Sequence, residues 1–341
     1  MREAFGAHFE VPAGYVNTAS IGIPSAAVAD AVADAVTGWR TGAARPPHYD
    51  RYVAAARRAW ARLTGVAPEH VASGASVSQL VGLVAASVPD RTRVVTVASE
   101  FTSVTFPFAA QDKRGVTVTE VPPDHLAEAA ADADLVAVSV VQSADGALAD
   151  LAALRAAGTP VLLDATQAAG WLPLRLDWAD YVVGGSYKWL FAPRGAAWLA
   201  VHPDARPLVP QAANWYAAQD PWDGVYGLPL RLADGARALD LSPVWFAQLG
   251  AAVSTEWLAA LDMASVRDHC THLADTVLAQ VGREPAGSAI ISLELTADQR
   301  GRLAAADVVS AERAGRTRLS FHLYNTEDDV DRVLGALATR S

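Results

Sequence analysis

The chain has 341 residues, of which 52% are apolar, and a formal net charge of −10. Such a chain can bury a large core, as two domains or as one large α/β domain with a smaller appendage. The charges are scattered without a dense basic cluster, the first residues lack an apolar signal core, and no apolar run reaches the ~18 residues of a membrane span. We therefore expect a cytoplasmic protein with neither a nucleic-acid nor a membrane partner, and its single cysteine excludes an internal disulfide.

Residues 1–24 are predicted to form an N-terminal arm that ends in an ordered loop, because Gly22 and Pro24 lie among small polar residues there. Helices are expected at about 25–40 and at 48–64, then a short strand at Val71-Ala72 and a helix from Val77 to Val88. Small residues, including Ala75 and Ser76, precede this last helix. Free N–H groups at a helix start suit an anion such as a phosphate, although ordinary helix caps have the same composition.

Alternation of strands and helices from about 70 to 200 predicts a largely parallel sheet. The expected strands cover residues 93–97, 116–121, 135–141, 161–164, 181–185 and 196–201. Phe101 follows the first of these strands, Ser143 follows the third, and Asp164 ends the fourth. In open α/β sheets, ligands bind at the carboxyl ends of the strands, which is where these three residues are expected. A buried carboxylate needs a cation or strong donors, so Asp164 is a candidate ligand group, the alternative being a cap of the following helix.

Lys188 lies between two predicted strands and has apolar and aromatic neighbours. Loss of water contact lowers the pKa of a lysine, and the neutral amine can form a Schiff base with an aldehyde. Many lysines near strand ends are simply solvated, so the pairing with Asp164 matters. Pyridoxal phosphate has an aldehyde that bonds a lysine and a protonated ring nitrogen that pairs with a carboxylate. Lys188 and Asp164 together match the two ends of that cofactor.

The remainder of the chain is predicted to contain a long irregular segment and a second domain. Residues 203–243 are rich in Pro, Gly and aromatic residues, which is typical of a functional or interface segment, unless the segment packs on its own domain. A helix at 244–261 is followed by strands at 290–295, 308–309 and 317–323, and by a helix from Thr326. We expect an arm (1–24), a large domain (25–245) and a small C-terminal domain (246–341).

Arg318 is the candidate for binding a substrate carboxylate, because a guanidinium can donate two parallel hydrogen bonds to it. Arg313 and Arg316 lie close enough in sequence to be rivals.

These features together resemble the fold-type I pyridoxal-phosphate enzymes of the class V aminotransferase and cysteine desulfurase-like group. Ergothioneine-type C–S lyases and class V aminotransferases are the members most similar in character. The resemblance runs from Asn17 to the C-terminal helix and rests on the motifs Asn17-Thr-Ala-Ser-Ile-Gly22, Gly74-Ala-Ser-Val-Ser78, Asp164-Ala-Thr-Gln167, Ser186-Tyr-Lys188 and Arg318-Leu-Ser-Phe-His-Leu-Tyr-Asn325. It implies a large domain with a mostly parallel seven-stranded sheet and a smaller α+β C-terminal domain. It also implies a pyridoxal 5′-phosphate cofactor, an amino-acid substrate, and a homodimer with active sites at the subunit interface.

The resemblance assigns a role to each matching residue. Lys188 and Asp164 would be catalytic, and the phosphate would be held by Ala75, Ser76 and Ser186. Phe101 would stack on the cofactor ring, the alternative being a core phenylalanine, and Gln167 would bond the ring hydroxyl. Asn17, Ser143 and Arg318 would contact the substrate. Trp215 (substrate) and Ser242 (cofactor) would act across the dimer.

The reaction is predicted from what the sequence lacks. A cysteine desulfurase needs a mobile cysteine shortly before the substrate arginine, and residues 305–317 contain none. Cys270 lies far upstream in a helical stretch and is interpreted as a packing residue. We expect a β-elimination or C–S lyase reaction through an aldimine at Lys188, with an aminotransferase or an epimerase as alternatives. A non-catalytic family member would lack one of Lys188, Asp164 and Arg318.

No metal is expected. The pair His269 and His272 has no evident third ligand for a catalytic zinc.

Overall fold

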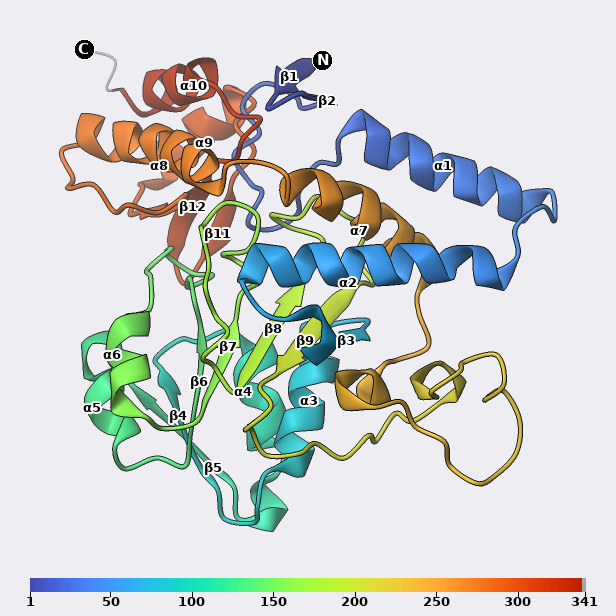
Figure 1. Cartoon of the computed structure of the whole chain (residues 1–341). Helices are drawn as coiled ribbons and strands as arrows, with labels where there is room; N and C mark the ends of the chain where they lie inside the picture. Colours follow the sequence, from blue (N-terminus) through green and yellow to red (C-terminus); the bar gives the residue numbers. More distant parts are fainter. Residues whose placement is uncertain (339–341) are drawn as a thin grey trace.

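The computed structural model describes residues 1–338, which are built around a seven-stranded sheet (Figure 1). Its strand order is β3-β9-β8-β7-β6-β4-β5. The strands are β3 (Val71–Gly74), β4 (Arg93–Val97), β5 (Thr117–Val121), β6 (Leu135–Ser139), β7 (Val161–Asp164), β8 (Tyr181–Gly185) and β9 (Ala197–Val201). Only β9 runs antiparallel to its neighbours, β8 and β3, so the predicted mostly parallel seven-stranded sheet is confirmed.

The central strands are buried on both faces, as their short apolar sequences predict. Leu163 and Val182 point into one apolar cluster, while Leu162 and Val183 point into another. The helices that supply the first cluster are α2 (Asp50–Thr64), α5 (Leu126–Ala130), α6 (Leu151–Ala157), α7 (Trp245–Leu258) and the first half of α8 (Met263–Gln280), and those of the second are α3 (Val77–Ser87) and α4 (Thr102–Ala109). Helix α1 (Ala26–Arg40) packs beside α7. Within residues 1–338, no helix has the length and apolar character needed to cross a membrane.

A smaller unit follows α7 and has its own apolar cluster, which includes Leu273, Ile291 and Leu319. It contains an antiparallel sheet of order β10-β12-β11 and three helices. The elements are α8 (Met263–Gln280), β10 (Ile290–Leu293), α9 (Ala297–Ala305), β11 (Ala311–Arg313), β12 (Arg316–Ser320) and α10 (Glu327–Leu337). The domain boundaries at residues 24 and 245 remain predictions.

The N-terminal arm lies against this smaller unit, at the same end of the molecule in Figure 1. It begins with the hairpin β1 (Arg2–Ala4) and β2 (Ala7–Phe9). The N–H of Gly14 donates to the Asp329 carboxylate at 2.8 Å, and the N–H of Ser320 donates to the Val16 carbonyl at 2.8 Å. The arm therefore extends along β12 before it reaches the large sheet.

The structure differs from the sequence analysis at one predicted strand and at one helix that was not predicted, and both differences have a physical reason. The strand expected at 308–309 is wrong, since Val309 forms only an isolated bridge with Tyr15 and the strand is β11, which exists through its hairpin with β12. Helix α4 was not predicted, because its β-branched residues and internal Pro107 disfavour a helix.

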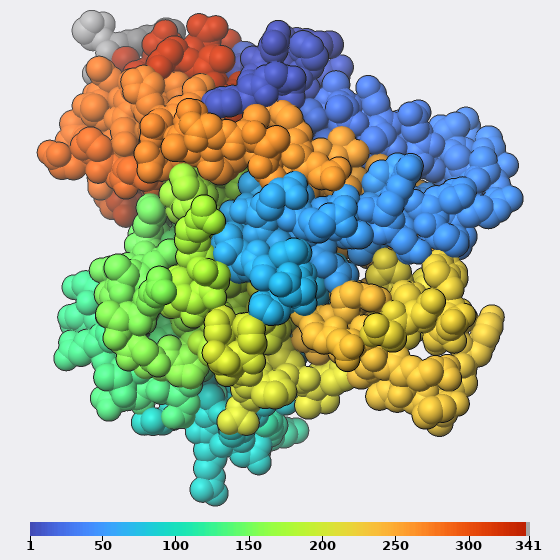
Figure 2. All heavy atoms as spheres, in the orientation of Figure 1, coloured from blue at the N-terminus to red at the C-terminus, as the bar shows by residue number. Residues whose placement is uncertain are grey.

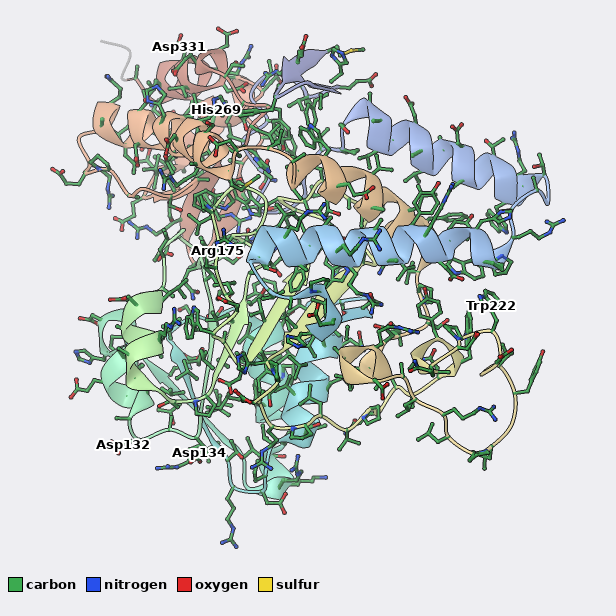
Figure 3. The ribbon with its side chains drawn as sticks, viewed as in Figure 1. Asp132, Asp134, Arg175, Trp222, His269 and Asp331 are labelled. Atoms are coloured by element: carbon green, nitrogen blue, oxygen red, sulfur yellow. The ribbon has the colours of Figure 1, made fainter. Side chains whose placement is uncertain are left out.

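The segment 203–243 is irregular apart from the short 3-10 helices η5 (Trp215–Ala217) and η6 (Gly235–Leu239). It projects from the lower right of the molecule in Figure 2, in yellow and orange. Its tip exposes large apolar side chains, with Tyr226 87% and Leu228 89% exposed. Trp222, labelled in Figure 3, donates from Nε1 to the Asp50 carboxylate at 2.9 Å and so ties the segment to the start of α2.

Candidate active site

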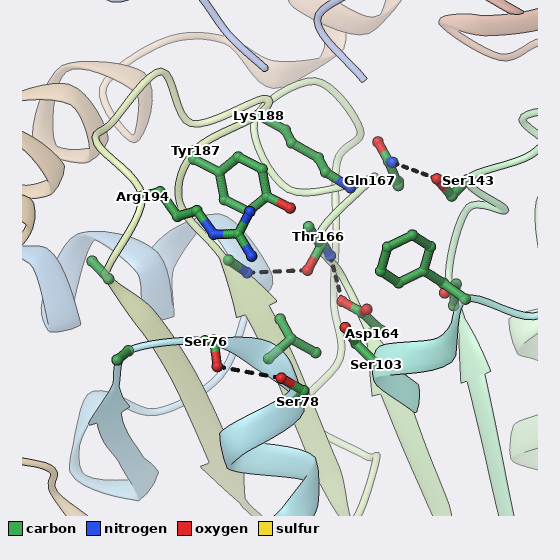
Figure 4. A pocket seen from close by; sticks show the side chains of 16 residues that line it. Ser76, Ser78, Ser103, Ser143, Asp164, Thr166, Gln167, Tyr187, Lys188 and Arg194 are labelled. Atoms are coloured by element: carbon green, nitrogen blue, oxygen red, sulfur yellow. Dashed lines mark hydrogen bonds between the residues drawn. The ribbon is translucent and has the colours of Figure 1, made fainter. Parts of the chain in front are cut away.

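Lys188 lies in a turn between β8 and β9 that is closed by its own hydrogen bonds. The N–H of Ser186 donates to the Ala196 carbonyl at 3.1 Å, and the Ser186 hydroxyl donates to the Pro193 carbonyl at 2.9 Å. The turn directs Lys188 into a cavity at the carboxyl ends of β6, β7 and β8 (Figure 4). The cavity is lined by Ala75, Ser76, Val77, Ser78, Phe101, Ser103, Ser139, Ser143, Asp164, Thr166, Gln167, Gly185, Tyr187, Lys188, Arg194 and Ala196.

Burial shifts the pKa values of both Lys188 and Asp164 toward their neutral forms. Burial lowers the pKa of Lys188 to about 8, against the opposing effect of Asp164. Burial likewise raises the pKa of Asp164 to about 6, although the Thr166 N–H donates to this carboxylate at 2.8 Å. Among residues 1–338, no lysine or arginine forms an ion pair with Asp164. A buried carboxylate with so few partners suits a cationic atom of a ligand.

One end of the cavity offers donors to a phosphate. Ser76 caps α3, accepting from the Gln79 N–H at 3.3 Å, and its hydroxyl lies 3.4 Å from the Ser78 hydroxyl; both serines line the cavity together with Arg194 (Figure 4). Arg194 lies 5.0 Å from the Tyr187 ring centroid and has no carboxylate partner in the described chain. A helix start, two hydroxyls and a guanidinium together suit a dianion.

Arg194 and Tyr187 were missed by the sequence analysis. The feature of the sequence that could have indicated them is their position in the same segment between two strands as Lys188.

Phe101 presents its ring to the cavity and is 40% exposed, which fits a stacking surface better than a core residue. The Lys188 amine lies 5.1 Å from its ring centroid. The preceding residue, Glu100, accepts the Phe101 N–H at 2.6 Å. The same carboxylate accepts the N–H and hydroxyl of Ser139, each at 2.7 Å, and the Gln142 amide at 2.8 Å. Glu100, not predicted from the sequence, thus fixes Phe101 relative to the end of β6.

Arg318 is buried behind Ser143, a residue that lines the cavity, and has 1% of its surface exposed. Its guanidinium donates to the Ser143 carbonyl at 2.5 Å, to the Ser143 hydroxyl at 3.1 Å and to the Ser20 hydroxyl at 2.8 Å. Its Nε has no acceptor, and no carboxylate pairs with it, within residues 1–338. Burial, together with the charge of Arg313, lowers its pKa to about 10. A buried guanidinium without a counter-ion is a binding group for an anion.

The structure brings Ser143, Gln167 and Asn17 into one hydrogen-bond network. The Gln167 amide donates to the Ser143 hydroxyl at 3.0 Å and to the Ala19 carbonyl at 3.1 Å. Gln167 Oε1 accepts the Trp189 Nε1–H at 2.7 Å, so Gln167 connects Ser143 to the arm and to the lysine turn, and its contact with a ring hydroxyl stays a prediction. Asn17 accepts the Ser20 hydroxyl at 2.7 Å, which places it one contact from Arg318.

Five predicted residues do not line the cavity. Arg318 and Asn17 lie behind its wall, joined to it through Ser143 and Ser20, and the other three are Ser186, Trp215 and Ser242. Ser186 does not line it, because its hydroxyl is bonded to Pro193, and the phosphate role expected for it passes to Arg194 in our interpretation. Trp215 packs against Trp222, with ring centroids 5.0 Å apart, and Ser242 is exposed. Neither residue reaches the cavity of its own chain.

The arm closes over the lysine turn at Gly22. Its N–H donates to the Tyr187 carbonyl at 3.0 Å, and a Cβ at this position would lie 1.9 Å from the Lys188 carbonyl oxygen. Only glycine permits this approach.

The donor set of the cavity fits pyridoxal phosphate. Asp164 can pair with the ring nitrogen, Phe101 can cover a ring face, and Lys188 can bond the aldehyde. The start of α3, with Ser76 and Arg194, can hold the phosphate.

Comparisons with known proteins agree with this fit. The chain is 27% identical to an uncharacterized aminotransferase, YcbU, of Bacillus subtilis, over 84% of this chain and 83% of that one. It is 29% identical to the isopenicillin N epimerase of Streptomyces clavuligerus, over 54% of this chain and 53% of that one. Its fold is similar to that of the cystine C–S lyase C-DES, solved with its product cysteine persulfide, with a TM-score of 0.83 and 18% identity over 96% of this chain and 97% of that one.

The family model for class V aminotransferases matches residues 52–292. The chain therefore belongs to the class V aminotransferase family and is an enzyme that depends on pyridoxal phosphate.

Proposed function

We propose that the enzyme removes a β-substituent from an amino acid, as a C–S lyase, with Lys188 as the group that moves the Cα proton. The observation that carries this proposal is the placement of Lys188. Its buried amine, with a pKa of about 8, faces a cavity lined by Asp164, which forms no ion pair within residues 1–338, and by Ser143, behind which the Arg318 guanidinium lies. An amine of that pKa is substantially neutral at slightly alkaline pH and can act as a base.

Each end of the cavity has a defined task in this proposal. Pyridoxal phosphate, when bound, supplies a covalent link to the substrate amine and accepts the electrons released at Cα. Asp164 holds the ring nitrogen in its protonated form, and Phe101 keeps the ring in place. Arg318 binds the α-carboxylate through two parallel hydrogen bonds, which directs the Cα–H bond toward Lys188.

The position of the cysteine supports elimination over a desulfurase reaction. Cys270 is fully buried in α8, 3.8 Å from Nδ1 of His322, and burial raises the pKa of its thiol. Such a thiol is not a nucleophile for a substrate in the cavity. Elimination needs no thiol, because the leaving group departs with the electron pair of its own C–S bond.

Two other reactions share the first step. Transamination is favoured by the similarity to YcbU, and epimerisation by the similarity to isopenicillin N epimerase. Both also start with removal of the Cα proton by Lys188. They differ from elimination because the β-substituent stays in place and a proton is returned, whereas in elimination the β-substituent leaves.

Product analysis separates the three reactions. Holoenzyme is incubated with L-cystine and with S-substituted L-cysteines, without a keto acid. We expect pyruvate, ammonia and the released sulfur compound in equal amounts. Cofactor absorbance that bleaches and returns only after a keto acid is added would assign an aminotransferase. Exchange of the Cα hydrogen with loss of optical activity, and without ammonia, would assign an epimerase.

We further propose that the enzyme is a homodimer that uses segment 203–243 as part of its interface. The exposed side chains of Tyr226, Leu228 and Leu230 support this, because monomeric proteins rarely expose such a patch. Trp215 and Ser242, which do not reach their own cavity, would then approach that of the partner.

Sedimentation equilibrium tests the dimer. Wild type and the control Val281→Asp, altered at an exposed valine at the end of α8, should have about twice the 35.8 kDa chain mass, and Leu228→Asp should approach one chain mass. A monomeric wild type would reject the dimer.

A further inference from the structure

Three arginines share one face of the smaller sheet. In the β11–β12 hairpin, Arg313 lies directly opposite Arg316, and Arg318 lies opposite Ala311. Residues two apart in a strand point to the same face, and so do residues directly opposite one another. Like charges that lie opposite each other on two paired strands repel and destabilise the strand pair. Anions that bind at this face would relieve the repulsion.

One of these charges is neutralised within the chain and two are not. Arg316 forms an ion pair with Glu294 at 3.0 Å. Arg313 and Arg318 form no ion pair with any carboxylate within residues 1–338. The carboxylate nearest in sequence, Glu312, points to the opposite face, where it accepts the Thr317 hydroxyl at 2.6 Å.

The two unpaired guanidinium groups converge on a single hydroxyl. Arg318 donates to Ser20 Oγ at 2.8 Å and Arg313 donates to the same atom at 3.4 Å. Arg318 is buried and Arg313 is exposed. One guanidinium therefore lies in the interior of the protein and the other at its surface. Both groups help to lower the pKa of Lys188, which places their charges near the reacting amine.

We propose that Arg313 binds a second anionic group, carried by the substrate side chain, and so selects amino acids with an acidic side chain. The inference rests on the proposed function, in which Arg318 holds the α-carboxylate. That carboxylate carries one charge and cannot neutralise both guanidinium groups. A side chain that extends from the buried end toward solvent meets Arg313, the group that remains without an anion.

Acid and amide substrate pairs test this selectivity. S-carboxymethyl-L-cysteine is compared with its amide, S-carbamoylmethyl-L-cysteine, and L-glutamate with L-glutamine, so that each pair differs in charge but hardly in shape. Binding to the holoenzyme is measured from the change in cofactor absorbance. We expect wild type to bind at least one acid about tenfold or more tighter than its amide. Because Arg313 is exposed, this ratio should fall as salt is added.

Three variants locate the effect. Arg313→Gln should bring the acid-to-amide ratio close to one without weakening binding of the amide. Arg318→Gln should weaken both members of each pair. Arg267→Gln is the matched control, since Arg267 is an exposed arginine on α8 that pairs with Asp268, and it should keep the wild-type ratio.

A second readout does not depend on the amino group of a ligand. Glutarate should raise the thermal unfolding temperature of the wild-type holoenzyme more than its monoamide does, and Arg313→Gln should remove that difference.

The outcomes distinguish this inference from the proposed function. A wild type that binds acids and amides equally, or an Arg313→Gln variant that keeps the preference, would overturn the role of Arg313 and leave the proposed function standing. A holoenzyme whose absorbance responds to no amino acid would overturn both.

Discussion

Replacing Lys188 by alanine is expected to remove the covalent bond to the cofactor and to lower turnover by about a thousandfold or more. Lys188 is the lysine that lines the cavity, and the substitution deletes both the bonding amine and the base. The cofactor should then be lost on gel filtration. The protein should lose with it the absorbance of the bound cofactor at the short-wavelength end of the visible range.

The chain offers an internal control for this experiment, because it contains only two lysines, Lys113 and Lys188. Lys113 lies in the short exposed turn Asp112–Arg114, and Lys113→Ala should retain both cofactor and turnover. Borohydride reduction of the wild-type holoenzyme followed by peptide mass analysis should find the cofactor mass on Lys188. Cofactor mass on Lys113, or normal turnover in Lys188→Ala, would disprove the assignment.

Asp164→Asn is expected to lower turnover by about a hundredfold or more, because an amide cannot hold the ring nitrogen in its protonated form. It should also change the pH dependence of stability in the cofactor-free protein. The folded-state pKa of Asp164 is about 6, above its ordinary value of 3.8. The folded state therefore binds the proton more tightly, and stability is lost as pH rises from about 4 through about 6. That loss amounts to at most about 3 kcal/mol.

Urea unfolding between pH 4 and pH 7 measures this effect as the difference between wild type and Asp164→Asn. Cofactor-free wild type should lose stability relative to the variant across this range, and pyridoxal phosphate should restore it by supplying a cation. Parallel pH profiles with and without cofactor would show that Asp164 is not the partner of the ring nitrogen.

The position of the cavity could be predicted from the sequence because its main residues follow strands whose apolar composition indicates that they are buried. β6, β7 and β8 are short apolar runs, so their ends, and with them Ser143, Asp164 and Lys188, were predicted to meet at one edge. Parallel strands place their carboxyl ends together whatever the intervening helices are. For this reason an incomplete prediction of the helices did not affect the site.

The hydrogen-bond partners within the site could not be predicted, because they depend on long-range packing. Ser20 and Arg318 are 298 residues apart in the chain, and nothing local in either sequence indicates their contact. The bonds of the Gln167 amide to Ser143 and to the Ala19 carbonyl were likewise not indicated by the sequence. In the sequence, Glu100 cannot be distinguished from an ordinary loop carboxylate. Its donors from Ser139 become evident only in the fold, where β6 pairs with β4.

The close approach of Gly22 to the lysine turn has a mechanical consequence. Ser20 contacts both unpaired arginines, and two residues later the arm meets the backbone of Tyr187 and Lys188 without room for a single methyl group. A short, tightly fitted piece of chain thus joins the two arginines to the backbone of the lysine turn. The same piece of chain therefore fixes the position of Ser20 and of the Lys188 backbone relative to each other, and a change at one of them alters the setting of the other.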